Sequence, residues 1–111
     1  MKRILLVDDQ PDVLRGIRRL LHGHFHVDVA GDAETAAELL ERRAYDAVLT
    51  DFNLPGRDGL WLLQRTKERR PAARRVLISG RPESEFDGVQ VLDRFLRKPA
   101  TKEELLAALE S

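Results

Sequence analysis

The chain has 111 residues and no cysteine, which is enough for one domain with its own core but excludes disulfides and cysteine metal ligands. Its 19 basic and 19 acidic residues cancel, so no global field would attract it to nucleic acid or an anionic membrane. The apolar start that ends at Val7 is too short for a signal peptide. We expect a single cytoplasmic domain, residues 1–111, without membrane insertion or direct nucleic-acid binding.

Short apolar runs alternate with helical patterns along the chain, which is typical of a parallel sheet with crossover helices. We expect strands at residues 4–7, 27–30, 47–50 and 76–78, and a last strand around residues 95–96. These runs predict an α/β fold with a single five-stranded parallel sheet.

Helices are expected between the strands. Pro11 opens the first, which runs to about residue 22, and a later one covers residues 60–70. Asp32 is placed to cap the second helix, whose inner face would be formed by small and apolar residues: Ala33, Ala36, Ala37, Leu40 and Ala44. Thr101 and Glu104 have the spacing of a capping box for the last helix.

The crossover between Ser79 and Asp93 departs from this alternation. It contains two glycines and a proline, and only Phe86 and Val89 suggest a helical face. We therefore predict that this fourth crossover helix is short, irregular or absent.

Polar residues follow the expected strands where each of them ends. Asp8 and Asp9 come after the first strand, Asp51 after the third, Ser79 ends the fourth and Lys98 follows the fifth. In parallel open sheets, ligands bind outside the carboxyl ends of the strands. The five side chains are therefore expected to converge on one site.

The residue types at this site indicate phosphoryl chemistry. Clustered carboxylates repel one another unless a cation lies among them, and oxygen ligands suit Mg²⁺ rather than zinc. Lys98 can pair with an anion, and the Ser79 hydroxyl can donate to it. An aspartate that accepts a phosphoryl group becomes an acyl phosphate.

Five motifs in the expected order carry a resemblance to a known family. The whole chain resembles the receiver domains of bacterial two-component response regulators, the CheY-like family. The matching motifs are Val7-Asp8-Asp9, Leu49-Thr50-Asp51, residues 54–59, Ile78-Ser79-Gly80 and residues 95–99. The resemblance implies a doubly wound, flavodoxin-like sheet in the strand order 2-1-3-4-5.

The resemblance also implies the roles of the acidic residues. Asp51 would be the phosphoacceptor. Asp9, Asp51 and the backbone carbonyl of Asn53 would bind Mg²⁺, and Asp8 would act on the ion through a water molecule. The phosphoryl donor would be a sensor histidine kinase or a histidine phosphotransfer protein.

The remaining motif residues are implied to form the switch. Lys98 would pair with a phosphoryl oxygen, and a cis bond would join it to Pro99. Ser79 would move to hydrogen-bond the phosphoryl group, and Phe95 stands where the family has its switch aromatic. Because phenylalanine has no hydroxyl, Phe95 can signal only by burying its ring. Self-phosphorylation and dephosphorylation are expected, but no turnover of an independent substrate.

Three alternatives share part of this pattern. A phosphorylation-independent receiver-like interaction module would keep the fold without the switch. A flavodoxin-like cofactor-binding domain would need hydroxyl- and glycine-rich phosphate loops where this chain has Asp8 and Asp9. An aspartyl-phosphate hydrolase would carry its nucleophile after the first strand, whereas Asp51 follows the third. The cognate kinase, the output partner, the oligomeric state and membership of a longer regulator stay open.

Histidine and tryptophan side chains suggest no second site. His22, His24 and His26 straddle an expected helix end, a turn and a strand start, so their side chains need not converge. Trp61 is interpreted as a packing or partly exposed residue early in the third helix.

Overall fold

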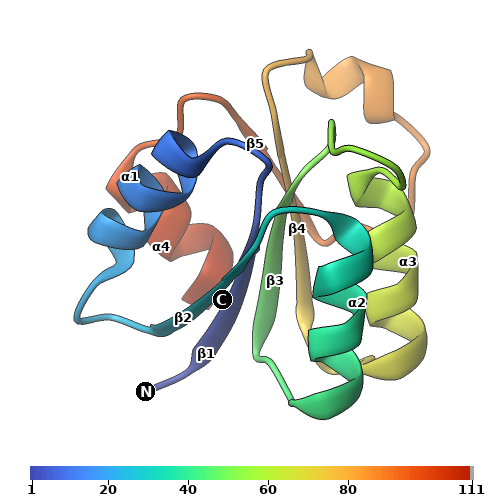
Figure 1. The fold of residues 1–111 in the computed structure, drawn as a ribbon. Coiled ribbons are helices and arrows are strands. Elements are labelled where there is room, and N and C mark those ends of the chain that lie inside the picture. The colour runs from blue at the N-terminus through green and yellow to red at the C-terminus, as the bar shows by residue number, and fades with distance from the viewer. Residues whose placement is uncertain (111) are drawn as a thin grey trace.

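The computed structural model describes residues 1–110, in which strands and helices alternate along the chain (Figure 1). The strands are β1 (Arg3–Val7), β2 (His26–Ala30), β3 (Ala47–Asp51), β4 (Arg74–Ser79) and β5 (Arg94–Arg97). The helices are α1 (Pro11–Leu21), α2 (Ala33–Arg42), α3 (Gly59–Arg69) and α4 (Lys102–Glu110), with a short 3₁₀ helix, η1 (Glu83–Phe86).

The five strands form one parallel sheet in the order β2-β1-β3-β4-β5. This order confirms the doubly wound fold that the sequence predicts. The register places Val7 beside Thr50, and Asp51 beside Ile78. The carboxyl ends of the central strands therefore lie at one edge, which brings distant parts of the sequence together.

Two helical layers cover the sheet, with α1 and α4 on one face and α2 and α3 on the other (Figure 1). Alternation along β1 divides its side chains between these layers: Leu5 packs on the α2/α3 side and Leu6 on the α1/α4 side. Both are almost completely buried. Burial on both faces explains why β1 and β3 are continuous apolar runs rather than alternating ones.

The helix in the crossover between β4 and β5 is short, as predicted. This crossover covers residues 80–93, of which only the four residues of η1 are helical, and Gly88 follows η1 with a φ of +80°, in the left-handed region that favours glycine. Phe86 is the buried residue of η1 and packs on the α2/α3 side of the sheet. The Phe86 ring therefore anchors η1 to the domain, and the partly buried Val89, Val91 and Leu92 pack against the same side.

Most predicted helix ends agree with the structure. Asp32 accepts a hydrogen bond from the Thr35 N–H at 2.7 Å, and Thr101 and Glu104 make the reciprocal bonds of a capping box. The prediction for Ala44 was wrong, because α2 ends before it and the residue is exposed. Arg43 has an extended backbone, which directs the chain away from the helix axis.

The third helix begins one residue earlier than predicted. Asp58 caps α3 by accepting a hydrogen bond from the Trp61 N–H at 2.9 Å, so that Gly59 is the first helical residue. Gly59 also lies against β3: a Cβ there would be 3.0 Å from the carbonyl carbon of Asp51. A glycine is therefore required where α3 meets the end of β3.

Candidate phosphoryl and metal site

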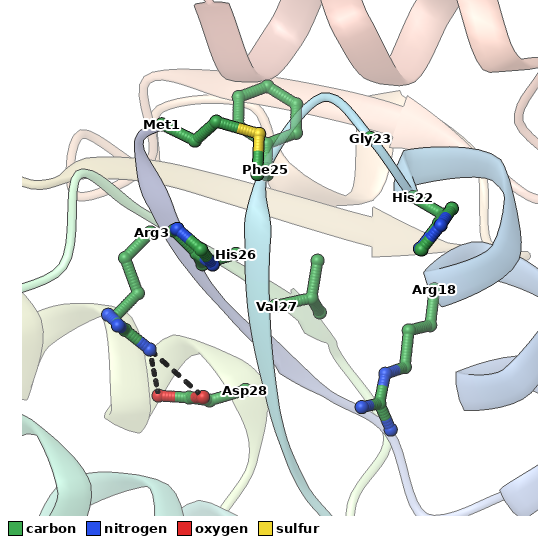
Figure 2. Close-up of a pocket in the computed structure, with 9 residues that line it drawn as sticks. All are labelled: Met1, Arg3, Arg18, His22, Gly23, Phe25, His26, Val27 and Asp28. Carbon is green, nitrogen blue, oxygen red and sulfur yellow. Dashed lines mark hydrogen bonds and ion pairs between the residues drawn. The ribbon is translucent and has the colours of Figure 1, made fainter.

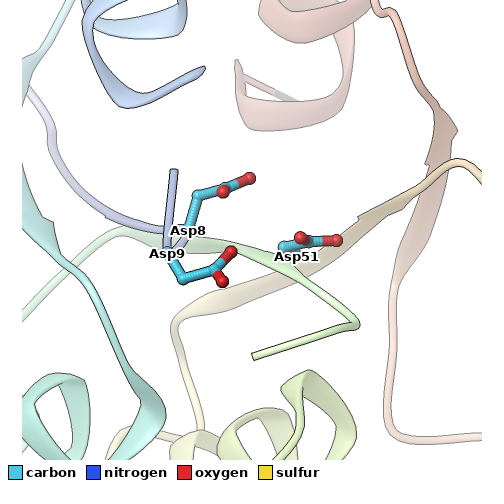
Figure 3. A group of neighbouring side chains, drawn as sticks. All are labelled: Asp8, Asp9 and Asp51. Carbon is cyan, nitrogen blue, oxygen red and sulfur yellow. The ribbon is translucent and has the colours of Figure 1, made fainter. Parts of the chain in front are cut away.

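Three carboxylates gather at the carboxyl ends of β1 and β3 (Figure 3). Asp8 and Asp9 follow β1, and Asp51 ends β3. Ligand oxygens of all three lie within 4.8 Å of one another. Asp8 is 1 % exposed and Asp51 7 %, whereas Asp9 is exposed to solvent. The group is thus open on one side and closed by protein on the other.

Lys98 supplies the only positive charge that the described residues place in contact with this group. Its ammonium lies 3.0 Å from Asp8 Oδ2 and 3.1 Å from Asp51 Oδ2. The Lys98 N–H donates to the Ser79 carbonyl at 2.9 Å, which joins the end of β5 to β4, and a cis bond joins Lys98 to Pro99. The side chain therefore reaches the acids from a fixed point on the sheet.

The two partners of this ion pair have perturbed acid–base properties. Burial raises the pKa of the Asp51 carboxyl, the charge of Asp8 raises it further, and Lys98 only partly opposes them. For Lys98, burial works to lower the pKa, but its hydrogen bonds to Asp8 and Asp51 outweigh burial and the pKa is raised. The single positive charge of Lys98 therefore does not fully offset the free-energy cost of keeping Asp51 ionised while it is buried beside Asp8.

These residues fit a hard divalent cation. Three carboxylates and one ammonium have a net charge of −2, and the oxygen donors are of the kind that Mg²⁺ prefers. Asn53, the fourth expected ligand, lies in the exposed loop after β3, and its backbone N–H donates to Asp51. The donor set and its excess negative charge are both consistent with a magnesium site.

Ser79 lies at the same edge but is engaged elsewhere. The side chain is fully buried, and its Oγ accepts a hydrogen bond from the Arg81 N–H at 3.0 Å. Arg81 begins the segment that leads into η1. The hydroxyl of Ser79 therefore connects the site directly to the segment that contains η1.

The switch position, Phe95, is half-buried in a row of three aromatic rings. The Phe86 ring lies 5.5 Å from that of Phe95 and 5.0 Å from that of Phe52, measured between centroids, and the guanidinium of Arg81 lies over Phe52. Sequence reasoning missed Arg81 and the contact between Phe86 and Phe95. Phe86 was noted only as part of a weak helical face, and nothing in the spacing indicated its partners.

The histidines and Trp61 lie outside this site. The three histidines are exposed, at the end of α1, in the following turn and at the start of β2. His22 and His26 line a hollow at the amino-terminal edge of the sheet, away from the acids (Figure 2). Trp61 is half-buried, and the guanidinium groups of Arg57 and Arg65 both lie over its ring.

Within residues 1–110, no helix is both long and apolar enough to cross a bilayer.

The fold and the acidic edge together define a class: a doubly wound parallel α/β domain with aspartates and a lysine at the carboxyl ends of its strands. The chain belongs to the response regulator receiver domain family, which it matches over residues 4–110. The family membership confirms the resemblance drawn from the sequence motifs, and this family is not one of conventional enzymes.

Curated relatives that match over nearly the whole chain include regulatory proteins about twice as long as this chain. The nitrate/nitrite response regulator NarL of Escherichia coli K12 is 35 % identical over 113 residues, which cover 96 % of this chain and 52 % of NarL. The transcriptional regulatory protein MctR of Rhizobium johnstonii is 29 % identical over 115 residues, which cover 98 % of this chain and 54 % of MctR. The chain spans about half the length of these relatives.

Solved structures of receiver domains superpose closely on this one. The signal receiver domain of an HD domain-containing protein from Pseudomonas fluorescens Pf-5 has a TM-score of 0.89 and 34 % identity, and the match covers 98 % of this chain and 91 % of that one. The response regulator TrrA of Thermotoga maritima, solved in complex with Mg²⁺ and BeF, has a TM-score of 0.87 and 25 % identity. The match covers 99 % of this chain and 97 % of that one.

Proposed function

We propose that the protein is a phosphorylation switch of two-component signal transduction, in which Asp51 accepts a phosphoryl group in a magnesium-dependent reaction. The observation that carries this proposal is the convergence of Asp8, Asp9 and Asp51 with Lys98 at the carboxyl edge of the sheet. The phosphoryl donor would be a sensor histidine kinase or a histidine phosphotransfer protein, and this protein would act in the cytoplasm.

The transfer itself needs little from the protein beyond position and charge. An oxygen of Asp51 forms the new P–O bond while the P–N bond of the donor phosphohistidine breaks, and the histidine retains the electron pair. Bound Mg²⁺ would supply positive charge that neutralises the phosphoryl oxygens, with Asp9, Asp51 and the Asn53 carbonyl as its protein ligands and Asp8 acting through water. Lys98 would leave its contact with Asp51 and pair with a phosphoryl oxygen.

The same event would release Ser79 from the crossover. If the Ser79 side chain turns toward the phosphoryl group to donate its proton, its Oγ moves away from the Arg81 N–H, from which it accepts a hydrogen bond here. Arg81 lies over Phe52, which packs on Phe86 and so reaches Phe95. We infer that phosphorylation moves η1 and the Phe95 ring together and so alters a protein-binding surface.

The energies are of the right size for such a switch. Moving a two-state equilibrium from 1:99 to 99:1 takes about 5.5 kcal/mol of differential interaction. Charge-assisted hydrogen bonds contribute roughly 1.5–3 kcal/mol each. Two new contacts to the phosphoryl group at the upper end of this range, or three of about 2 kcal/mol each, would therefore be sufficient.

The competing function is a receiver-like interaction module that works without phosphorylation. The short crossover favours it, since η1 replaces a full helix next to the switch position. The complete set of acids with Lys98 favours the phosphorylation switch.

Incubation with Mg²⁺ and acetyl phosphate, followed by intact mass measurement, distinguishes the two functions. The switch predicts one added phosphoryl group, which is lost with EDTA and in Asp51→Asn. Absence of an adduct, together with failure to bind beryllofluoride, would instead support the interaction module.

A further inference from the structure

The outer edge of β2 has unpaired backbone groups. Within residues 1–110, β2 pairs on one side only, with β1. The Ala30 carbonyl faces β1, where it accepts from the Asp8 N–H at 3.2 Å. Because backbone groups alternate in direction along a strand, Val27 and Val29 turn their N–H and C=O groups outward. The edge therefore offers donors and acceptors to an added strand.

A hollow of ≈ 540 Å³ lies along this edge, between α1 and α2. Its apolar surface comes from the β2 valines and Leu39 of α2, and Val29 is 37 % exposed. Arg18 of α1 lies on one side, and Arg42 and Arg43 lie at the end of α2. The edge is thus an apolar strip flanked by arginines from two helices.

Positive charge on this surface is not balanced. Asp28 is the one acidic residue among those that line the hollow. The Asp28 carboxylate already bonds Arg3, Arg43 and the Tyr45 hydroxyl. Figure 2 shows the contact with Arg3. Arg18 and Arg42 form no ion pair with any residue in the described range 1–110. Two guanidinium groups beside an unpaired strand are therefore available to carboxylates of a ligand.

We propose that the β2 edge binds an extended, acidic segment of a partner protein, which adds to the sheet as a sixth strand. Backbone pairing with Val27 and Val29 would supply affinity, and Arg18 and Arg42 would select acidic side chains. A second copy of the chain is disfavoured, because β2 paired with β2 would bring like charges together. A nucleic acid has phosphates but no peptide backbone to pair with the edge. The proposal does not depend on phosphorylation of Asp51.

The test uses the 111-residue chain and a capped peptide of alternating glutamate and valine, followed by amide NMR at low salt. Binding should shift the Val27 and Val29 amides and slow their exchange with solvent. The same peptide N-methylated at alternate residues, and a peptide with lysine for glutamate, should not bind. N-methylation blocks strand pairing without altering the protein.

Charge reversal then locates the site. Arg18→Glu with Arg42→Glu should weaken binding about tenfold or more, as expected for loss and reversal of two charge pairs. Both residues are exposed, so the fold should be retained. Arg94→Glu on the opposite edge strand, β5, is the matched control and should change nothing. Equal binding of the N-methylated peptide, equal shifts with an oligothymidylate, or no effect of the double reversal would overturn the proposal.

Discussion

The ammonium of Lys98 lies 3.1 Å from a carboxylate oxygen of Asp51. Asp51 ends β3 and Lys98 directly follows β5, and β4 separates these two strands in the sheet. Lys98 contacts Asp8 at nearly the same distance. One cation thus occupies the space between two buried acids, which is also the space that a divalent cation and a phosphoryl group would need.

Lys98→Met should therefore have opposite effects on magnesium and on phosphorylation. Loss of the competing ammonium should tighten Mg²⁺ binding, measured by isothermal titration calorimetry. The rate of phosphorylation by acetyl phosphate should fall about a hundredfold or more, the usual cost of removing one stabilising donor from a reaction centre. Lys102→Met, at an exposed position of α4, is the control. Weaker Mg²⁺ binding in Lys98→Met would contradict this account.

Gly59→Ala should destabilise the domain by about 3 kcal/mol, the upper range for an overpacked position. The new methyl group would lie against the backbone of Asp51 and 3.1 Å from the Phe52 Cα, and backbone atoms cannot give way cheaply. Gly16→Ala in α1 meets nothing within 4 Å and should instead stabilise by about 0.5–1 kcal/mol. Urea unfolding measures both, and equal effects of the two substitutions would refute the close contact at Gly59.

Asp32→Ala should cost about 1 kcal/mol at neutral pH, because it removes the cap of α2. Hydrogen bonding to Thr35 lowers the pKa of Asp32 in the folded state. The stabilisation is therefore fully present above the unfolded pKa of about 4 and is lost as the pH falls through the folded value. Asp32→Asn, which keeps the acceptor, should retain most of the stability. If Asp32→Ala lowers the stability equally at neutral and at acid pH, the charge of Asp32 does not contribute to the cap.

The single tyrosine provides a spectroscopic test of the contact between β2 and the loop that precedes β3. Burial, together with the hydrogen bond of 2.8 Å to Asp28, raises the pKa of Tyr45 to about 12. Tyrosinate absorbance should therefore appear near pH 12 in the folded protein and near pH 10 in denaturant. The neutral phenol stabilises the fold below pH 10, and this contribution is lost as the pH rises to about 12.

Asp28→Asn provides the check on this assignment. The substitution should lower the Tyr45 pKa without restoring the unfolded value, since burial remains. A normal titration in the folded wild-type protein, with circular dichroism unchanged, would show that the phenol is not held as described.

Ser79→Ala should separate phosphorylation from the response to it. The variant keeps Asp51 and Lys98 and should still accept a phosphoryl group, but it lacks the hydroxyl that bonds the Arg81 N–H. On addition of beryllofluoride and Mg²⁺, amide shifts in residues 81–95 should be large in the wild-type protein and much smaller in the variant. Equal shifts in both proteins would mean that Ser79 does not couple the site to η1.

Sequence patterns predicted the sheet, the short helix between β4 and β5, and the meeting of Asp8, Asp9, Asp51 and Lys98 at one edge, because each depends on local signals. Apolar runs mark buried strands, and polar residues directly after them are brought together by parallel topology alone. The Asp32 cap and the Thr101–Glu104 box depend on contacts within one turn, which spacing reveals.

Contacts that the sequence did not indicate connect residues through three-dimensional packing. The Phe86 ring meets Phe52 and Phe95 only because η1 folds over the end of the sheet. The need for glycine at position 59 arises from the approach of α3 to β3, which no local pattern encodes. Ala44 was wrongly assigned because helical periodicity continues past Arg42, although the backbone turns at Arg43.

The central claim is that Asp51 is the phosphoacceptor, and locating the modified residue tests it most directly. The protein would be treated with acetyl phosphate and Mg²⁺ and then with borohydride, which reduces an aspartyl phosphate to homoserine, and digested for peptide mass mapping. We predict homoserine at position 51 and at no other aspartate, with none formed in EDTA. Modification of Asp8 or Asp9 in place of Asp51, or no homoserine at all, would contradict the proposed switch.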